Sequence, residues 1–460
     1  MRGASMAPHM RWTACALLVV ASTLVPSAFG ALASAAGPRG AFLIGTVLMV
    51  ALAALLTALW PRETTPAANG QTRYWPAAVA GVAGLIILSR VAWQLLPVAF
   101  AGPLDPNRAD MLVIIEHAIT QLLAGGNPYA IHQVPWDAPL SYGPVLWLPF
   151  VVPHVLRVDL RILTLAAQLT VPALVLFQAS WRAGRGDAGR AIVLGALGVA
   201  LAFNPDIMRF HAIGQTQVYW PLLLVFCGLL AGERWTAAAV CLGLLVAART
   251  TMVAIVPVFL IHLAVIRQLS RRRIVVLALA CALPFLPFVL VDPRTVWYAM
   301  VGVYTKVMKG YVWQSTTWAI DTYGITGRLL EHGLERYVEL VQGALLIATY
   351  ALAWRALRRG GRPEPWMALA LLIFSMTTLW PVIYLYFDVW ILLAGRWSRT
   401  MALAGCRRGV PDAPCPPQRW SRSSSCSSRP RSGLDRPTRS ISVIPRRPGT
   451  RAAASDVTSP

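Results

Sequence analysis

Long apolar runs recur along the chain from Thr13 to about Arg396, and short polar segments separate them. A helix needs about 20 mostly apolar residues to cross the hydrocarbon core of a bilayer. The pattern therefore predicts an all-α polytopic membrane protein with about twelve membrane-spanning helices. They are expected at 13–36, 41–60, 76–100, 160–181, 190–206, 214–232, 235–249, 251–266, 274–291, 337–357, 366–380 and 382–396.

Two of the apolar stretches, 235–266 and 366–396, are long enough to form either one oversized helix or two short crossings. Counting 235–266 as one crossing would place Arg267 and the arginines at 271–273 outside, although arginine favours the cytoplasmic side. We therefore divide the first stretch at Arg249 and the second between Trp380 and Pro381. With the N-terminus inside, the arginine-containing segments then fall in the cytoplasm, at 61–75, 182–190, 267–273 and 355–365.

This topology places two long loops, 101–159 and 292–336, on the outer side. The first loop contains an amphipathic segment from Asp110 onward, followed by Gly-Gly at 125–126, which is typical of a helix end. Its apolar residues are expected to rest on lipid or on the helical bundle, and its polar face to lie above an outer cavity. The apolar segment 144–156 is too short to cross, so it is expected to be an interfacial or re-entrant helix.

Composition narrows the possible functions. The chain is 57% hydrophobic and only 13% charged, with a mean hydropathy of +0.57, which excludes a soluble enzyme. The net charge of +22 is explained by positive cytoplasmic loops, so no nucleic-acid partner is expected. The seven cysteines form no CxxC pattern, and no group of His, Asp and Glu has metal-ligand spacing. We expect no disulfide framework, no metal site and no cofactor.

Three regions are predicted along the chain. Residues 1–75 form an N-terminal transmembrane hairpin, and 76–405 form the main membrane domain. Residues 406–460 are rich in Arg, Ser and Pro without hydrophobic periodicity, which is the composition of a disordered tail.

Several short motifs follow one another on the predicted outer side of the main domain. They are Gly-Gly-Asn-Pro-Tyr at 125–129, Ser-Tyr-Gly-Pro at 141–144, Gly-Gln at 214–215, Arg-Thr at 249–250 and the aromatic segment 380–386. Their order resembles glycosyltransferase family 87, the actinobacterial C-type (GT-C) membrane glycosyltransferases that include polyprenyl-phosphate-mannose-dependent mannosyltransferases. The resemblance spans about Pro76 to Arg396. It departs from the family pattern at Gly143, where Pro is frequent, and at Arg249-Thr250, where Lys-Pro is commoner.

The resemblance implies transfer of a hexose, mannose first among the candidates, from a polyprenyl-phosphate sugar to a lipid or glycan acceptor at the outer face of the cell membrane. An acidic residue in the first outer loop would accept the proton of the acceptor hydroxyl. Asp110 is the candidate base, with Asp105 as the alternative. The departing phosphate needs cationic partners, for which Arg249, Lys306 and Lys309 are the candidates. Further candidate substrate contacts are Asn127, Tyr129, His211, Gln215 and Tyr386.

Each candidate also has a purely structural interpretation. Asp110 can act only as a helix N-cap, and Asp105 as a turn residue. Asn127 and Tyr129 suit a turn, His211 and Gln215 suit helix ends, and Tyr386 suits an aromatic belt at the membrane interface. The alternative function for the whole chain is a lipid-linked saccharide transporter or flippase. A transporter is expected to show internal repeats and ionisable residues within its spans.

Overall fold

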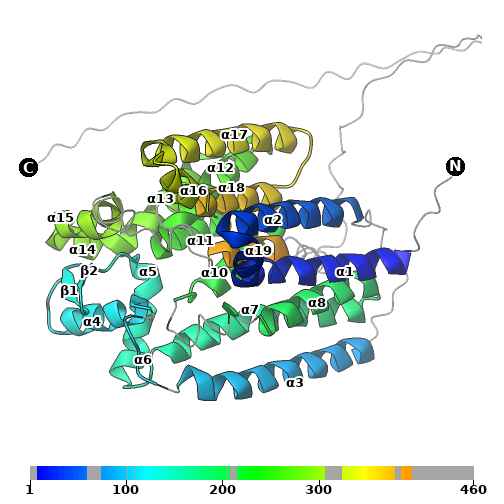
Figure 1. Ribbon diagram of the computed structural model, residues 1–460, viewed down its shortest axis with the longest axis horizontal. Coiled ribbons are helices and arrows are strands. Elements are labelled where there is room, and N and C mark those ends of the chain that lie inside the picture. Colours follow the sequence, from blue (N-terminus) through cyan, green and yellow to red (C-terminus); the bar gives the residue numbers. More distant parts are fainter. Residues whose placement is uncertain are drawn as a thin grey trace, which may run out of the picture. The chain divides into compact units, whose positions relative to one another are not determined.

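The computed structural model describes residues 8–59, 74–100, 102–107, 109–204, 206–207, 214, 216–305, 324–378 and 385–395 (Figure 1). The predicted tail, 406–460, lies outside the described residues. Among the described residues, the fold is helical apart from one two-stranded hairpin. This confirms the all-α class.

The α-helices of the described chain, in order, are α1 (Pro8–Leu24), α2 (Phe29–Leu59), α3 (Tyr74–Ala99), α4 (Met111–Leu123), α5 (Pro144–Trp147), α6 (Val151–Val155), α7 (Arg161–Gly184), α8 (Ala188–Ala202), α10 (Trp220–Ala231), α11 (Trp235–Ala248), α12 (Val256–Val265), α13 (Arg271–Ala282), α14 (Leu286–Val291), α15 (Pro293–Trp297), α16 (Ile325–Glu331), α17 (Val338–Arg358), α18 (Glu364–Thr377) and α19 (Leu385–Gly395).

Shorter 3₁₀ or π-helical turns join some of these helices. They are η1 (Pro26–Ala28), η2 (Leu148–Phe150), η3 (Thr250–Ile255), η4 (Leu283–Phe285), η5 (Tyr298–Gly302) and η7 (Glu335–Tyr337). The strands β1 (Ile131–Gln133) and β2 (Asp137–Pro139) pair antiparallel, with His132 opposite Ala138.

The N-terminal hairpin differs from its predicted boundaries. The first crossing was expected to run from 13 to 36, but α1 ends at Leu24 and the turn η1 begins at Pro26. Proline lacks a backbone N–H and clashes with the preceding turn, so it ends the helix there. Helix α2 then contains a kink at Gly37, whose φ of 71° suits glycine.

Among the described residues, three helical segments are long and apolar enough to cross a membrane by length and composition. They are Arg161–Gly184, Arg271–Val291 and Glu335–Arg358. Most of the other predicted crossings are shorter apolar helices of 10 to 17 residues. The structure therefore confirms an apolar helical bundle, while the number of crossings stays a prediction.

The predicted division at Arg249 is present in the structure. The backbone of Arg249 is extended, with φ −142° and ψ 119°, between the end of α11 and the start of η3. The rings of Trp235 and His262 lie 5.4 Å apart, so the start of α11 is beside the end of α12. The two helices are thus antiparallel, as two crossings require. The second long stretch also contains two helices, because α18 ends at Thr377 and α19 begins at Leu385.

The directions of α1 and α8 show at which end of the bundle the arginine-containing segment 182–190 lies. Trp12 lies against Gly189, and Asn204 donates to the carbonyl of Thr23 at 3.1 Å, so α1 and α8 run in the same direction. The starts of both helices and segment 182–190 therefore share one end, which we call the arginine end.

The opposite end, where residues 102–160 lie, is called the loop end. Gln168 donates to Gln217 at 3.0 Å, which places the start of α10 near the loop-end half of α7. Because α10, α11 and α12 then alternate in direction, segment 267–273 returns to the arginine end. Segments 182–190 and 267–273 therefore share one end of the bundle, as predicted, while most of segment 61–75 lies outside the described residues. Which side of the membrane that end faces stays a prediction.

Candidate active site

The first part of the candidate site is helix α4, which the amphipathic pattern predicted. Leu112, Ile115 and Ile119 are fully buried and belong to the main hydrophobic core, so the apolar face rests on the bundle. The helix ends before Gly125, whose φ of 80° is readily adopted only by a residue without a side chain. These core contacts fix the start of α4, and with it Asp110, at the loop end of the bundle.

Asp110 occupies the N-cap position of α4, but its side chain makes no capping hydrogen bond in the structure. Its carboxylate is half-buried and accepts a hydrogen bond from Trp136, at the turn of the β1–β2 hairpin. Burial raises the pKa of Asp110, while this hydrogen bond acts in the opposite direction. A raised pKa makes the carboxylate a stronger proton acceptor.

Asp105, the alternative base, has its carboxylate engaged in a local turn. Its Oδ1 accepts from the backbone N–H of Asn107 at 3.0 Å and from the Asn107 amide at 3.1 Å. This is the geometry of an Asx turn. The arrangement favours Asp110 over Asp105 as the group available to a substrate.

The Gly-Gly-Asn-Pro-Tyr motif forms a packed turn. Asn127 Oδ1 accepts from the backbone N–H of Tyr129 at 2.9 Å. The fully buried Tyr129 donates from its hydroxyl to Tyr142 O at 3.2 Å and accepts from Trp147 Nε1 at 3.2 Å. In this structure these polar atoms of Asn127 and Tyr129 form hydrogen bonds that hold the turn in place. Their predicted contact with a sugar stays a prediction.

The Ser-Tyr-Gly-Pro motif lies against the end of α11, next to Arg249. A Cβ atom on Gly143 would collide with the carbonyl oxygen of Ala247 and lie 3.3 Å from that of Ala248. Only glycine permits this approach of the two backbones. Close packing thus explains the glycine at 143, where the family pattern often has proline. The same packing places this motif of the first loop beside Ala248, the residue before Arg249.

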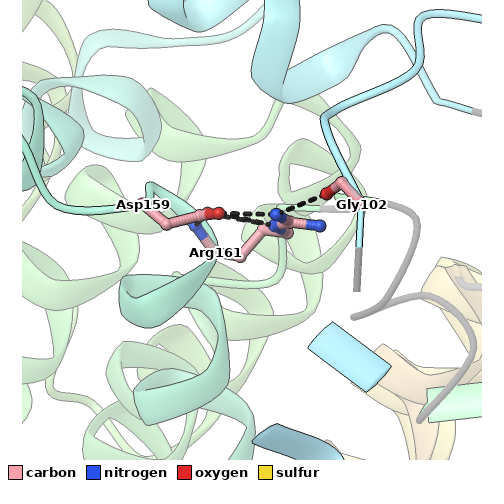
Figure 2. Close-up of polar contacts among 3 residues, drawn as sticks. All are labelled: Gly102, Asp159 and Arg161. Atoms are coloured by element: carbon pink, nitrogen blue, oxygen red, sulfur yellow. Dashed lines mark hydrogen bonds and ion pairs between the residues drawn. The ribbon is translucent and has the colours of Figure 1, made fainter. Parts of the chain in front are cut away.

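The base of the first loop is closed by an ion pair. Figure 2 shows Arg161, at the start of α7, between Asp159 and the carbonyl of Gly102. Arg161 Nη2 lies 2.5 Å from Asp159 Oδ2 and donates to Gly102 O at 2.9 Å. The side chain is only 6% exposed and its guanidinium lies 5.4 Å from the ring centroid of Phe100. Both ends of the loop are thereby held together at the same point.

Gly214 and residues 216–220 link α4 with the interior of the bundle. A Cβ on Gly214 would lie 3.4 Å from Leu112 Cδ1, and Thr216 Oγ1 is 3.9 Å from Met111 Sδ, directly beside Asp110. Three residues further on, Tyr219 and Trp220 begin α10. One short segment thus contacts the start of α4 and supplies side chains to the cluster described next.

A buried polar cluster surrounds Asp388, which is fully buried in α19. Tyr219 Oη donates to the Asp388 carboxylate, at 2.9 Å from Oδ1 and 2.8 Å from Oδ2. Trp220 Nε1 donates to Oδ1 at 2.7 Å. The guanidinium of Arg249 lies 5.6 Å from the ring centroid of Tyr219 and interacts electrostatically with Asp388. The cluster therefore joins Arg249 to an acidic residue that the sequence analysis did not select.

A small cavity lies beside this cluster, lined by Gln168, Trp220, Phe387 and apolar neighbours. Its volume of about 10 Å³ is enough for about one water molecule. The cavity is too small for a sugar ring.

The remaining candidates cannot be placed. His211, Gln215, Lys306 and Lys309 lie outside the described residues. Tyr386 lies in α19, but its side chain is outside the described part. Within the described ranges, no group of three or more His, Cys, Asp or Glu side chains is suited to a metal ion. The absence of a metal site from the whole protein stays a prediction.

The sequence matches glycosyltransferase family 87 over residues 140–381, more than half of the 460 residues. Comparisons with curated proteins and with solved structures find no match. The matched region includes Gly143, Gly214 and Arg249, whereas Asp110 and Asp388 lie outside it. It is shorter than the predicted range of resemblance, which ran from about Pro76 to Arg396. Because the match covers more than half of the chain, and the described residues form an apolar helical bundle, the chain belongs to glycosyltransferase family 87, whose members transfer sugars.

Proposed function

We propose that this membrane glycosyltransferase is a multi-pass GT-C enzyme of the cell membrane. It transfers a hexose, mannose first among the candidates, from a polyprenyl phosphate to a lipid or glycan acceptor. The active site lies at the loop end, facing the outer side of the membrane. The observation that carries the proposal is that residues 216–220 lie close to two chemically complementary groups. Thr216 is 3.9 Å from Met111, the residue after the half-buried carboxylate Asp110, and the ring of Tyr219 lies 5.6 Å from the guanidinium of Arg249.

Asp110 serves as the general base. The acceptor hydroxyl oxygen forms a bond to C1 of the sugar as its proton passes to the Asp110 carboxylate. At the same time the bond between C1 and the phosphate oxygen breaks, and the phosphate leaves with the electron pair. Two features support this role: the carboxylate is not used as a helix cap, and burial raises its pKa.

Arg249 stabilises the departing phosphate. Its charge lies at the break between two apolar helices, where a cation is costly unless it is paired or used. A guanidinium can hold phosphate oxygens through two parallel hydrogen bonds, which a single ammonium group does not provide. Lys306 and Lys309, in the second loop, are further candidates for the same phosphate.

A transfer assay tests the proposal. Membranes that contain the protein are given labelled polyprenyl-phosphate mannose, and the lipid extract is analysed for a new labelled glycolipid. Membranes with the Asp110→Asn variant at the same protein level are the control. We expect product in the first sample and a loss of about 10²- to 10⁴-fold in the second.

The same assay separates the alternatives. Product formed only when the donor is a labelled nucleotide sugar would contradict the lipid-phosphate donor. Movement of the labelled donor to the other leaflet without a new glycosidic bond would instead support the transporter. The charges of Asp388 and Arg249 within the bundle are the observation that favours this alternative.

A further inference from the structure

We infer that Asp388 is a positioning residue that fixes the guanidinium of Arg249 for the donor phosphate, with Tyr219 as the connecting element between the two. The inference rests on the proposed function, in which Arg249 contacts the phosphate. It adds a carboxylate that lies outside the region matching the family and that no motif indicated.

The first argument is the burial of Asp388. Its exposed fraction is 0%, and it is the only acidic residue of α19, an otherwise apolar helix. A carboxylate within a membrane bundle is expensive and is retained where it pairs with a cation or serves function. The cation is Arg249, which interacts with Asp388 electrostatically.

The second argument is the direction in which Asp388 is held. Two donors from the start of α10 reach the carboxylate, Tyr219 Oη at 2.8 Å and Trp220 Nε1 at 2.7 Å. Hydrogen bonds to an ionised carboxylate are about twice as strong as neutral ones, so they hold the group in one orientation. A carboxylate fixed by two aromatic side chains presents a fixed negative charge to its neighbours.

The third argument is the double contact of Tyr219. Its hydroxyl binds Asp388, while its ring lies 5.6 Å from the guanidinium carbon of Arg249. A cation over an aromatic face is attracted to the ring, and the planar guanidinium also stacks on it. The arginine is thereby restrained by the ring and by the carboxylate at once.

Such a restraint matters because an arginine side chain is long and flexible. A group that is already oriented loses less conformational freedom when its ligand binds, so binding is tighter. Asp388 does not itself need to reach the donor, because it is fully buried and the adjoining cavity of about 10 Å³ admits no sugar. Its effect on catalysis is therefore expected to pass through Arg249.

The test measures donor kinetics in four variants. Asp388→Asn keeps the size of the side chain and its ability to accept hydrogen bonds, but removes the charge that holds Arg249. We expect kcat/KM for the polyprenyl-phosphate donor to fall by about tenfold or more, with little change in KM for the acceptor. Asp388→Glu restores part of the loss. We expect the double variant, Asp388→Asn with Arg249→Gln, to be no more impaired than Arg249→Gln alone, because the substitution of Asp388 acts through Arg249.

The matched control is Glu364→Gln, which neutralises another buried acid of the bundle, at the first turn of α18 and 3% exposed. It is expected to leave donor kinetics unchanged. If Asp388→Asn does not accumulate in the membrane, Tyr219→Phe replaces it. Tyr219→Phe keeps the ring next to Arg249 and loses only the hydroxyl, so it should lower kcat/KM for the donor by a smaller factor than Asp388→Asn.

Two results would overturn the inference, and they differ from each other. In the first, the wild type is active, but the losses of the two single variants multiply in the double variant, or Asp388→Asn affects the donor and the acceptor equally. This result would leave the proposed function intact and make Asp388 a purely structural residue. A wild-type protein that neither transfers sugar from the donor nor gains thermal stability from polyprenyl phosphate would overturn the proposed function and this inference together.

Discussion

Asp110 and Asp388 are two carboxylates at the same end of the bundle with different surroundings. Asp110 is half-buried beside Trp136, which is 40% exposed, whereas Asp388 is 0% exposed and enclosed by Tyr219 and Trp220. A general base must come within hydrogen-bond reach of the acceptor hydroxyl. Of the two, Asp110 is the more accessible carboxylate, so we propose Asp110 as the base and Asp388 as the positioning residue.

The environment of Asp110 predicts a pH dependence. The base is active when deprotonated, so kcat/KM rises as pH increases through the pKa of Asp110, which burial places above that of an exposed aspartate. Trp136→Phe removes a hydrogen bond that stabilises the carboxylate, so the pKa increases further. We expect the acidic limb of the pH profile to move to higher pH in this variant.

The matched control is Trp93→Phe, at a tryptophan of α3 that is 79% exposed. Its acidic limb should coincide with that of the wild type. An acidic limb that stays in place in Trp136→Phe, or that moves to lower pH, would show that the indole does not stabilise the ionised base.

The sequence indicated Asp110 but not Asp388, and the reason is physical. Asp110 opens an amphipathic helix in a polar loop, so its position is visible as a pattern. Asp388 stands alone in an apolar run, and its partners, Tyr219 and Arg249, are 169 and 139 residues away. An acid in the middle of a predicted crossing, 382–396, was nevertheless a usable signal, because such residues are usually functional.

At the scale of elements, the loop end depends on two close contacts between segments far apart in the sequence. Arg161 binds Asp159 and Gly102 and so closes the first loop (Figure 2). Gly143 brings the second motif of that loop against the end of α11. The hydrophobic periodicity predicted α4, and the positions of the arginines after residue 266 predicted the break at Arg249. Neither pattern could predict their mutual placement, which depends on tertiary packing.

Gly143→Ala tests the second contact. The added methyl group collides with the carbonyl oxygen of Ala247, so either the loop or α11 must shift. Inserting a methyl group into a well-packed site typically costs about 1–3 kcal/mol. We expect a lower free energy of unfolding, measured in detergent by denaturant or heat, together with reduced transfer activity because Arg249 follows directly after α11.

Gly228→Ala is the control, since a Cβ at this position in α10 would meet nothing within 4 Å. Alanine favours helix by about 1 kcal/mol over glycine, so this variant should be as stable as the wild type or more stable. Equal stability of both variants would contradict the close approach at Gly143.

At the scale of the whole molecule, the arginine segments 182–190 and 267–273 lie at one end of the bundle and the candidate site lies at the other. The proposed topology places the arginine end in the cytoplasm. In a background with the seven native cysteines replaced by alanine, a cysteine at Arg185 should resist an impermeant thiol reagent added to intact cells. A cysteine at Asp137, on the exposed hairpin, should be modified. The opposite labelling pattern would place the candidate site in the cytoplasm.

The general base in the first loop is the central claim, and the turnover of two variants tests it most directly. With saturating polyprenyl-phosphate sugar and acceptor, Asp110→Asn should accumulate normally in the membrane yet lose about 10²- to 10⁴-fold in kcat. Asp105→Asn should lose much less, because Asp105 is engaged in a turn with Asn107. Wild-type turnover in Asp110→Asn, or a greater loss in Asp105→Asn, would contradict the account.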